Sequence, residues 1–83
     1  MKLQDLPPGC NAVITEVSDL HPNDVVARRL RELGFVPGES VRIVGRGPIA
    51  KDPLAVQIGY TRFALRRVEA SRIDVERGTG RPC

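Results

Sequence analysis

The sequence of 83 residues is short of the side chains that most enzymes use: it has no tryptophan, one histidine and two cysteines. A serine or cysteine nucleophile needs a neighbouring base, most often histidine, and the only histidine, His21, lies in a Leu-His-Pro-Asn turn. There is no Gly-x-x-x-x-Gly-Lys phosphate-binding loop and no recognisable carboxylate pair of a glycosidase. We therefore predict that the protein is not an enzyme and holds no cofactor.

Long apolar runs are also absent, since no stretch approaches the roughly 20 residues that cross a bilayer. No charged and then apolar leader follows Met1. We therefore expect a cytoplasmic protein that does not insert into membranes. Cytoplasmic proteins rarely keep disulfides, and Cys10 and Cys83 stand near opposite ends of the chain. A structural disulfide between them is not expected.

Metal ligands are scarce as well. His21 lies near Asp19 and Asp24 in the sequence, and an imidazole with carboxylates can hold zinc. A structural zinc site, however, uses four closely spaced ligands, usually cysteine and histidine. We expect no functional metal site, and at most adventitious zinc at His21, Asp19 and Asp24.

What the chain does have is a mild positive charge, with thirteen basic residues against ten acidic ones and a net charge of +3. That total suits an acidic protein, a nucleic acid or an anionic membrane about equally. Only Phe35, Tyr60 and Phe63 are aromatic, and the two phenylalanines are expected in the core. Because single-stranded nucleic acids are bound largely by stacking on aromatic side chains, nucleic acid is not the expected partner.

One amphipathic helix is predicted. Val26, Leu30 and Leu33 stand at i, i+4 and i+7, which places them on one stripe that needs a core to cover it. Asn23 is a good N-cap, and Asp24 puts a carboxylate in the first turn, where the helix dipole favours it. The helix is therefore expected to begin near Asp24.

The end of this helix is marked just as clearly. Gly34 can take the left-handed conformation that ends a helix, Phe35 can pack back over the last turn, and Pro37-Gly38 favours a tight turn. The rest of the chain alternates apolar and polar residues over short stretches, the pattern of half-buried strands. Strands are predicted over 12–17, 41–44, 54–58, 62–65 and 72–76, and one helical turn over 66–71. The glycines and proline of 45–48 are expected to stop regular pairing or to mark a loop.

These elements predict a mainly β domain with one inserted α-helix. A small, strongly bent antiparallel sheet usually closes into a barrel to remove its edges. The expected fold is a small SH3-like β-barrel over residues 1–76, followed by a flexible C-terminal tail over residues 77–83.

Several segments resemble the ferrous iron transport protein A family, FeoA, when they are taken in order: Leu6-Pro7-Pro8-Gly9, Arg29-Leu30, Leu33-Gly34, Pro37-Gly38, Asp52-Pro53, Ala64-Leu65-Arg66-Arg67 and Glu69-Ala70. The similarity extends over nearly the whole chain. It implies a cytoplasmic SH3-like module that assists FeoB, a membrane transporter whose cytoplasmic part binds and hydrolyses GTP.

Such a module would act by protein contact. Because arginine and tyrosine are enriched at interface anchors, we expect Arg28, Arg31, Tyr60 and Arg62 to supply the partner-binding surface. An exposed barrel edge also makes a homodimer a candidate assembly. Three other classes remain open: a module related to the C-terminal domain of iron-dependent repressors, a stand-alone nucleic-acid-binding barrel, and a GTPase activator that donates an arginine finger.

Overall fold

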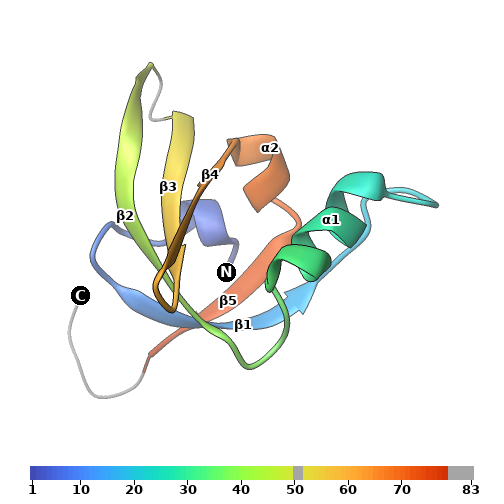
Figure 1. Ribbon diagram of the computed structural model, residues 1–83, viewed down its shortest axis with the longest axis horizontal. Helices are drawn as coiled ribbons and strands as arrows, with labels where there is room; N and C mark the ends of the chain where they lie inside the picture. The colour runs from blue at the N-terminus through green and yellow to red at the C-terminus, as the bar shows by residue number, and fades with distance from the viewer. Residues whose placement is uncertain (50–51, 79–83) are drawn as a thin grey trace.

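The computed structural model describes residues 1–49 and 52–78 and confirms the predicted mainly β, SH3-like fold (Figure 1). One α-helix is inserted after the first strand, and a single helical turn precedes the last strand. In chain order the elements are the 3-10 turn η1 (Leu3–Asp5), β1 (Asn11–Val17), α1 (Val25–Leu33), β2 (Ser40–Ile49), β3 (Asp52–Ile58), β4 (Thr61–Leu65), α2 (Arg67–Ala70) and β5 (Ile73–Arg77).

The five strands form one antiparallel sheet in the order β4-β3-β2-β1-β5. Strand β1 therefore lies between β2 and the C-terminal strand β5, which is far from it in the sequence. Strands β4 and β5 are the two ends of the sheet, and α2 connects them (Figure 1). The bend of the sheet wraps the strands around the core that α1 and η1 help to cover.

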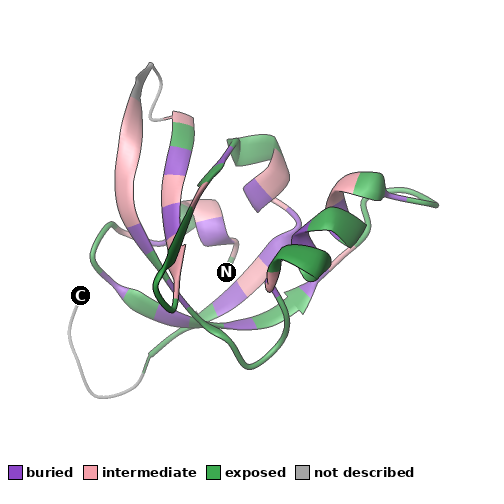
Figure 2. Ribbon diagram, in the orientation of Figure 1, coloured by how far each residue is buried: buried purple, intermediate pink, exposed green. Residues whose placement is uncertain are grey.

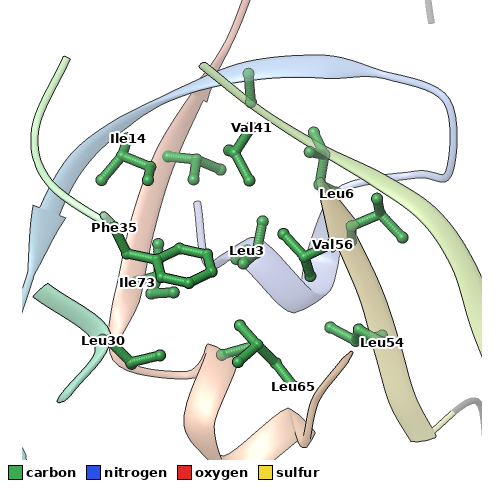
Figure 3. Packing of buried hydrophobic residues seen from close by; sticks show 14 of the residues in the cluster. Leu3, Leu6, Ile14, Leu30, Phe35, Val41, Leu54, Val56, Leu65 and Ile73 are labelled. Atoms are coloured by element: carbon green, nitrogen blue, oxygen red, sulfur yellow. The ribbon is translucent and has the colours of Figure 1, made fainter. Parts of the chain in front are cut away.

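A single hydrophobic core fills the inside of the bent sheet. Buried positions alternate with exposed ones along β1, as expected for a strand with one face on the core (Figure 2). The ring of Phe35 is fully buried and points into the space among Leu3, Leu30 and Ile73 (Figure 3). The largest fully buried side chains are those of Phe35, Leu3, Leu6, Ile14, Ile43, Leu54, Ile73, Val41, Val56 and Val75.

Helix α1 begins one residue later than predicted, because its N-cap is Asp24 and not Asn23. The carboxylate of Asp24 accepts hydrogen bonds from the backbone N–H groups of Val26 and Ala27, at 3.1 and 3.2 Å. Asn23 instead has a φ of 58°, a left-handed conformation that asparagine tolerates better than most residues. Asn23 therefore turns the chain before the helix, and Asp24 caps the first turn.

The predicted end of the helix is confirmed. Gly34 has a φ of 112°, and the N–H of Phe35 donates to the carbonyl of Leu30 at 3.0 Å. The predicted core stripe is only partly correct: Leu30 is buried and Val26 half-buried, but Leu33 is 41% exposed. The last turn of α1 extends past the edge of the core, and this leaves Leu33 at the surface.

Strand β2 runs through the segment that was predicted to stop regular pairing or to mark a loop. The sequence prediction ended the strand at Val44, whereas the structure continues it to Ile49 with register irregularities between Ile43 and Gly45 and between Arg46 and Ile49. Regular pairing is interrupted at Gly47 and Pro48, as predicted, but the strand does not end there. Instead Gly47 permits a close approach, because a β-carbon there would lie 2.5 Å from the carbonyl carbon of Asp52 and overlap its oxygen.

Gly47→Ala is therefore expected to destabilise the β2–β3 hairpin by about 1–3 kcal/mol, the usual cost of overpacking. The matched control is Gly45→Ala, since a β-carbon at Gly45 would make only an ordinary contact, 3.7 Å from that of Ala55. Urea unfolding of both variants is the measurement. Equal losses of unfolding free energy in the two variants would contradict the close approach at Gly47.

The other predicted strands agree with the structure to within two residues, and the helical turn over 66–71 is α2. The predicted domain boundary at residue 76 falls inside β5, which ends at Arg77, and residues 79–83 of the predicted tail lie outside the described part of the chain. Contrary to the expectation of no structural disulfide, Cys10 is disulfide-bonded. Cys83, the other residue of that expectation, lies outside the described residues.

Candidate functional site

An apolar groove of about 460 Å³ opens between helix α1 on one side and strand β4 with α2 on the other. In Figure 1 helix α1 lies on the side of the molecule away from the β2–β3 hairpin, whereas β4 lies next to β3. The walls come from residues 25–33 and 63–69, two segments that are far apart in the sequence. The groove is lined by Val25, Val26, Arg29, Leu30, Leu33, Phe63, Ala64, Leu65 and Glu69.

The floor of the groove belongs to the core, and its rim is exposed. Leu30 and Leu65 are buried, and the ring of Phe63 packs against that of Phe35 with 5.2 Å between ring centroids. On the rim, Val25 is 66% exposed and Leu33 is 41% exposed. Neighbouring exposed apolar side chains around a hollow are typical of a surface that binds a partner.

Two charged residues, Arg29 and Glu69, border the groove, and they differ in the hydrogen bonds that their side chains form. On α2, Glu69 accepts a hydrogen bond from the backbone N–H of Arg66 at 2.8 Å, which caps the helical turn. On α1, Arg29 is exposed, and it forms no ion pair or side-chain hydrogen bond within residues 1–49 and 52–78. The groove therefore presents an apolar floor with an unpaired arginine on one wall and a glutamate on the other.

The two walls are joined by a buried ion pair. Asp24, the N-cap of α1, is 2% exposed and accepts a hydrogen bond from Nε of Arg72 at 2.7 Å. The same oxygen, Oδ2, accepts one from the N–H of Leu20 at 3.0 Å. The Asp24 carboxylate thus fixes the start of α1, the loop before it, and the residue that precedes β5.

Arg72 extends this link to the second wall, because its Nη1 donates to the carbonyl of Val68 in α2 at 2.7 Å. The Arg72 hydrogen bond holds the pKa of the Asp24 carboxyl well below its ordinary value, with help from backbone N–H groups and against burial, which acts in the opposite direction. The pair therefore stays ionised, and it fixes the position of α1 relative to α2.

Neither arginine predicted on α1 lines the groove. Arg31 has a structural role: its Nη2 donates to the carbonyl of Val17 and to Oδ1 of Asp19, each at 2.7 Å, which ties the helix to the end of β1. Arg28 is exposed on the helix. Of the two predicted partner-binding residues on α1, Arg31 is thus engaged within the fold, and Arg28 is exposed outside the groove.

Tyr60 and Arg62, the other two predicted residues, lie in and next to the two-residue β3–β4 turn, and they do not line the groove either. Tyr60 is fully exposed, and Nε of Arg62 donates to Oε1 of Gln57 at 3.3 Å. The groove instead uses their chain neighbours, Arg29 beside Arg28 and Phe63 beside Arg62.

The three residues considered for adventitious zinc do not form a ready site. Nε2 of His21 lies 3.9 Å from Oδ1 of Asp24, and both oxygens of that carboxylate already accept hydrogen bonds. Asp19 is paired with Arg31. Within the part of the chain that the structure describes, no three metal-ligating side chains gather.

None of the helices described is long and apolar enough to cross a membrane.

The sequence reasoning missed the groove, although one signal was present. Val25 stands next to Val26, so the apolar face of α1 is wider than the stripe through Leu30 that the core needs. When the apolar face of a helix is wider than the part that packs on the core, the remaining apolar side chains are available for another contact. The opposite wall had no such signal, because it depends on how the bent sheet brings β4 round to face α1.

The fold and the groove together define a small SH3-like domain with an open apolar groove. The model of the FeoA domain matches residues 1–77, and the chain belongs to the FeoA family of ferrous iron transport accessory domains. The crystal structure of Stenotrophomonas maltophilia FeoA complexed with zinc is 58% identical, with a TM-score of 0.85 and a match that covers 92% of this chain and 89% of that one.

Two further relatives show how the domain occurs elsewhere. The solution structure of iron(II) transport protein A from Clostridium thermocellum is 38% identical, with a TM-score of 0.80, and the match covers 93% of this chain and 45% of that one. A fusion of Fe(2+) transport protein A with the Fe(2+) transporter FeoB, from Porphyromonas gingivalis, is 36% identical over 76 residues. The match covers 92% of this chain, which spans only 8% of the length of the fusion protein.

Proposed function

We propose that this protein is a cytoplasmic accessory protein of ferrous iron uptake that acts by binding the cytoplasmic part of a FeoB transporter. The observation that carries the proposal is the relative in which the same domain and FeoB form a single polypeptide. Fusion of two functions into one chain is typical of proteins that work in contact. The apolar groove between α1 and β4 is the surface that we assign to this contact.

An accessory domain of this kind acts by binding one conformation of its partner more tightly than another. The partner's equilibrium then shifts by the difference between the two binding free energies, and a domain with equal affinity for both states shifts nothing. In this proposal no metal, cofactor or catalytic side chain of the accessory protein takes part.

The experiment that tests the proposal is a calorimetric titration of the protein against the cytoplasmic part of FeoB from the same cell, once with GTP and once with GDP. We expect binding, with an affinity that differs between the two nucleotides. Absence of binding in both states would overturn the proposal. Steep salt-dependent binding to DNA or RNA would instead favour the nucleic-acid alternative.

The groove can be tested with two neighbouring residues. Arg29→Glu is expected to weaken FeoB binding at least about tenfold, because Arg29 lines the groove and has no ion-pair partner among the described residues. Arg28→Glu is the matched control, since it makes the same charge change one residue away, outside the groove. If Arg28→Glu weakened binding as much as Arg29→Glu, the contact would lie on the outer face of α1.

The homodimer stays a prediction, and we propose that any such assembly is secondary to partner binding. Sedimentation of the isolated protein over a range of concentrations measures it directly. A dimer that dissociates when FeoB is added would indicate that both contacts use the same surface.

A further inference from the structure

The two end strands of the sheet are not protected equally. Strand β5 is covered by the N-terminal segment: Lys2 forms a β-bridge with Asp74, and the N–H of Val75 donates to the carbonyl of Met1 at 2.8 Å. Strand β4 pairs with β3 on one side, and no other described strand pairs with it. Exposed sheet edges are normally blocked, because they present unpaired backbone groups to other chains. The open edge at β4 is the exception in this fold.

The register of the β3–β4 hairpin shows which backbone groups face outward. The loop has two residues, with Gly59 at a φ of 57°, so Ile58 and Thr61 are the hydrogen-bonded pair that closes the hairpin. Hydrogen-bonded and non-hydrogen-bonded pairs alternate along an antiparallel ladder. The N–H and C=O groups of Arg62 and Ala64 therefore point away from β3, toward the open edge.

This open edge forms one side of the groove, since Phe63, Ala64 and Leu65 line it opposite α1. A strand edge facing a helix across an apolar groove is a geometry that accepts an extended peptide as an additional strand. We propose that an extended segment of the partner adds to β4 as a further β-strand between β4 and α1. Its backbone would pair with that of Arg62 and Ala64.

The groove also defines the chemistry of that segment. In an extended chain alternate side chains point to one side, and the half-buried Phe63 with the buried Leu30 and Leu65 offers those side chains an apolar floor. Arg29, which has no ion-pair partner among the described residues, suits an aspartate or glutamate on the α1 side of the groove, away from Glu69 on the α2 side. The occupant is thus an extended segment with alternate apolar residues and an acidic side chain.

A second copy of this chain fits the edge less well than such a segment. Pairing of two β4 strands would bring Arg62 and Arg66 of one copy close to the same cations of the other, and like charges in neighbouring strands are destabilising. The inference rests on the proposed function, because it assigns the way in which the groove binds FeoB.

The test uses Ala64→Pro. Proline removes the N–H that faces the open edge but no bond to β3, and proline is tolerated on edge strands in this orientation. Ala64→Ser, which keeps the N–H, is the control. Both variants are titrated against the cytoplasmic part of FeoB and against overlapping synthetic peptides that cover its sequence, after thermal melting has shown that each variant is folded.

We expect Ala64→Pro to weaken binding at least about tenfold, while Ala64→Ser binds within about twofold of wild type, since only the former loses the backbone donor. Hydrogen exchange supplies a second readout: the amides of Arg62 and Ala64 exchange fast in the free protein and are protected in the complex. If FeoB binds but these amides stay unprotected and Ala64→Pro binds normally, strand addition is overturned while the proposed function stands. If nothing binds wild type, the proposed function fails, and the inference fails with it.

Discussion

Phe35→Ala is expected to lower the free energy of unfolding by about 3–5 kcal/mol, the usual cost of removing a buried phenylalanine ring. Phe35 is fully buried, lies directly after the helix cap, and packs against the ring of Phe63 beneath the groove. Domains of this size have only about 5–15 kcal/mol of stability in total. The substitution is therefore expected to remove a large fraction of the total stability and to lower the melting temperature clearly.

Urea unfolding followed by circular dichroism measures this loss. Tyr60→Ala is the control, because Tyr60 is fully exposed and its removal should change the unfolding free energy by no more than about 0.5 kcal/mol. A loss below about 1 kcal/mol for Phe35→Ala would show that the core can collapse around the vacated space, contrary to the packing described here.

The second large effect is expected at Asp24→Asn. The substitution keeps a side-chain oxygen for the helix cap but leaves the guanidinium of Arg72, itself 6% exposed, without its charged partner. Removing one member of a buried ion pair is strongly destabilising, because the remaining charge is isolated from water. We expect a clear fall in the urea midpoint and a loosening of α1 from α2, visible as faster amide exchange in the first turn of α1.

The same pair gives the protein a defined dependence on pH. The pKa of Asp24 is lowered in the folded state, whereas in the unfolded chain it is near the ordinary value of about 3.9. The stability that Asp24 supplies is therefore fully present above that ordinary value and is lost as the pH falls through the lower folded value. Urea midpoints measured from pH 6 downward should fall more steeply for wild type than for Asp24→Asn below about pH 4.

A double variant separates the pair from the cap. In Arg72→Met no guanidinium remains to be left unpaired, so adding Asp24→Asn to it is expected to cost less stability than adding the same change to wild type. Equal costs in the two backgrounds would show that Asp24 acts through the helix cap alone.

The sequence predicted those parts of the fold that depend on local chemistry. The cap at Gly34, the turn at Pro37-Gly38 and the alternation along β1 and β5 need only neighbouring residues to be interpreted. The predictions were wrong where the local structure depends on contacts with residues far away in the sequence. At Gly47 the strand continues because the absence of a side chain leaves room for the carbonyl of Asp52 in β3. A single sequence does not show that these two backbone segments lie so close together.

The candidate site was less predictable for the same reason. Arg31 was predicted to bind a partner because arginine is common at interfaces. In the folded chain, however, its guanidinium donates hydrogen bonds to the carbonyl of Val17 and the carboxylate of Asp19. The ion pair between Asp24 and Arg72 joins residues 48 positions apart, and local spacing instead favoured Asp24 as an ordinary first-turn carboxylate. Only the bend of the sheet makes a groove from α1 and β4.

The place of β1 in the sheet also governs when the domain can form during synthesis. One edge of β1 pairs with β2, and the other edge pairs with β5. Strand β5 (residues 73–77) is synthesised much later than β1, so this second pairing forms late. Contacts between such distant segments slow folding, because the loop between them must close before they are formed. A nascent chain still lacking β5 therefore presents β1 as a second open edge, and the sheet is completed only after nearly the whole domain has left the ribosome.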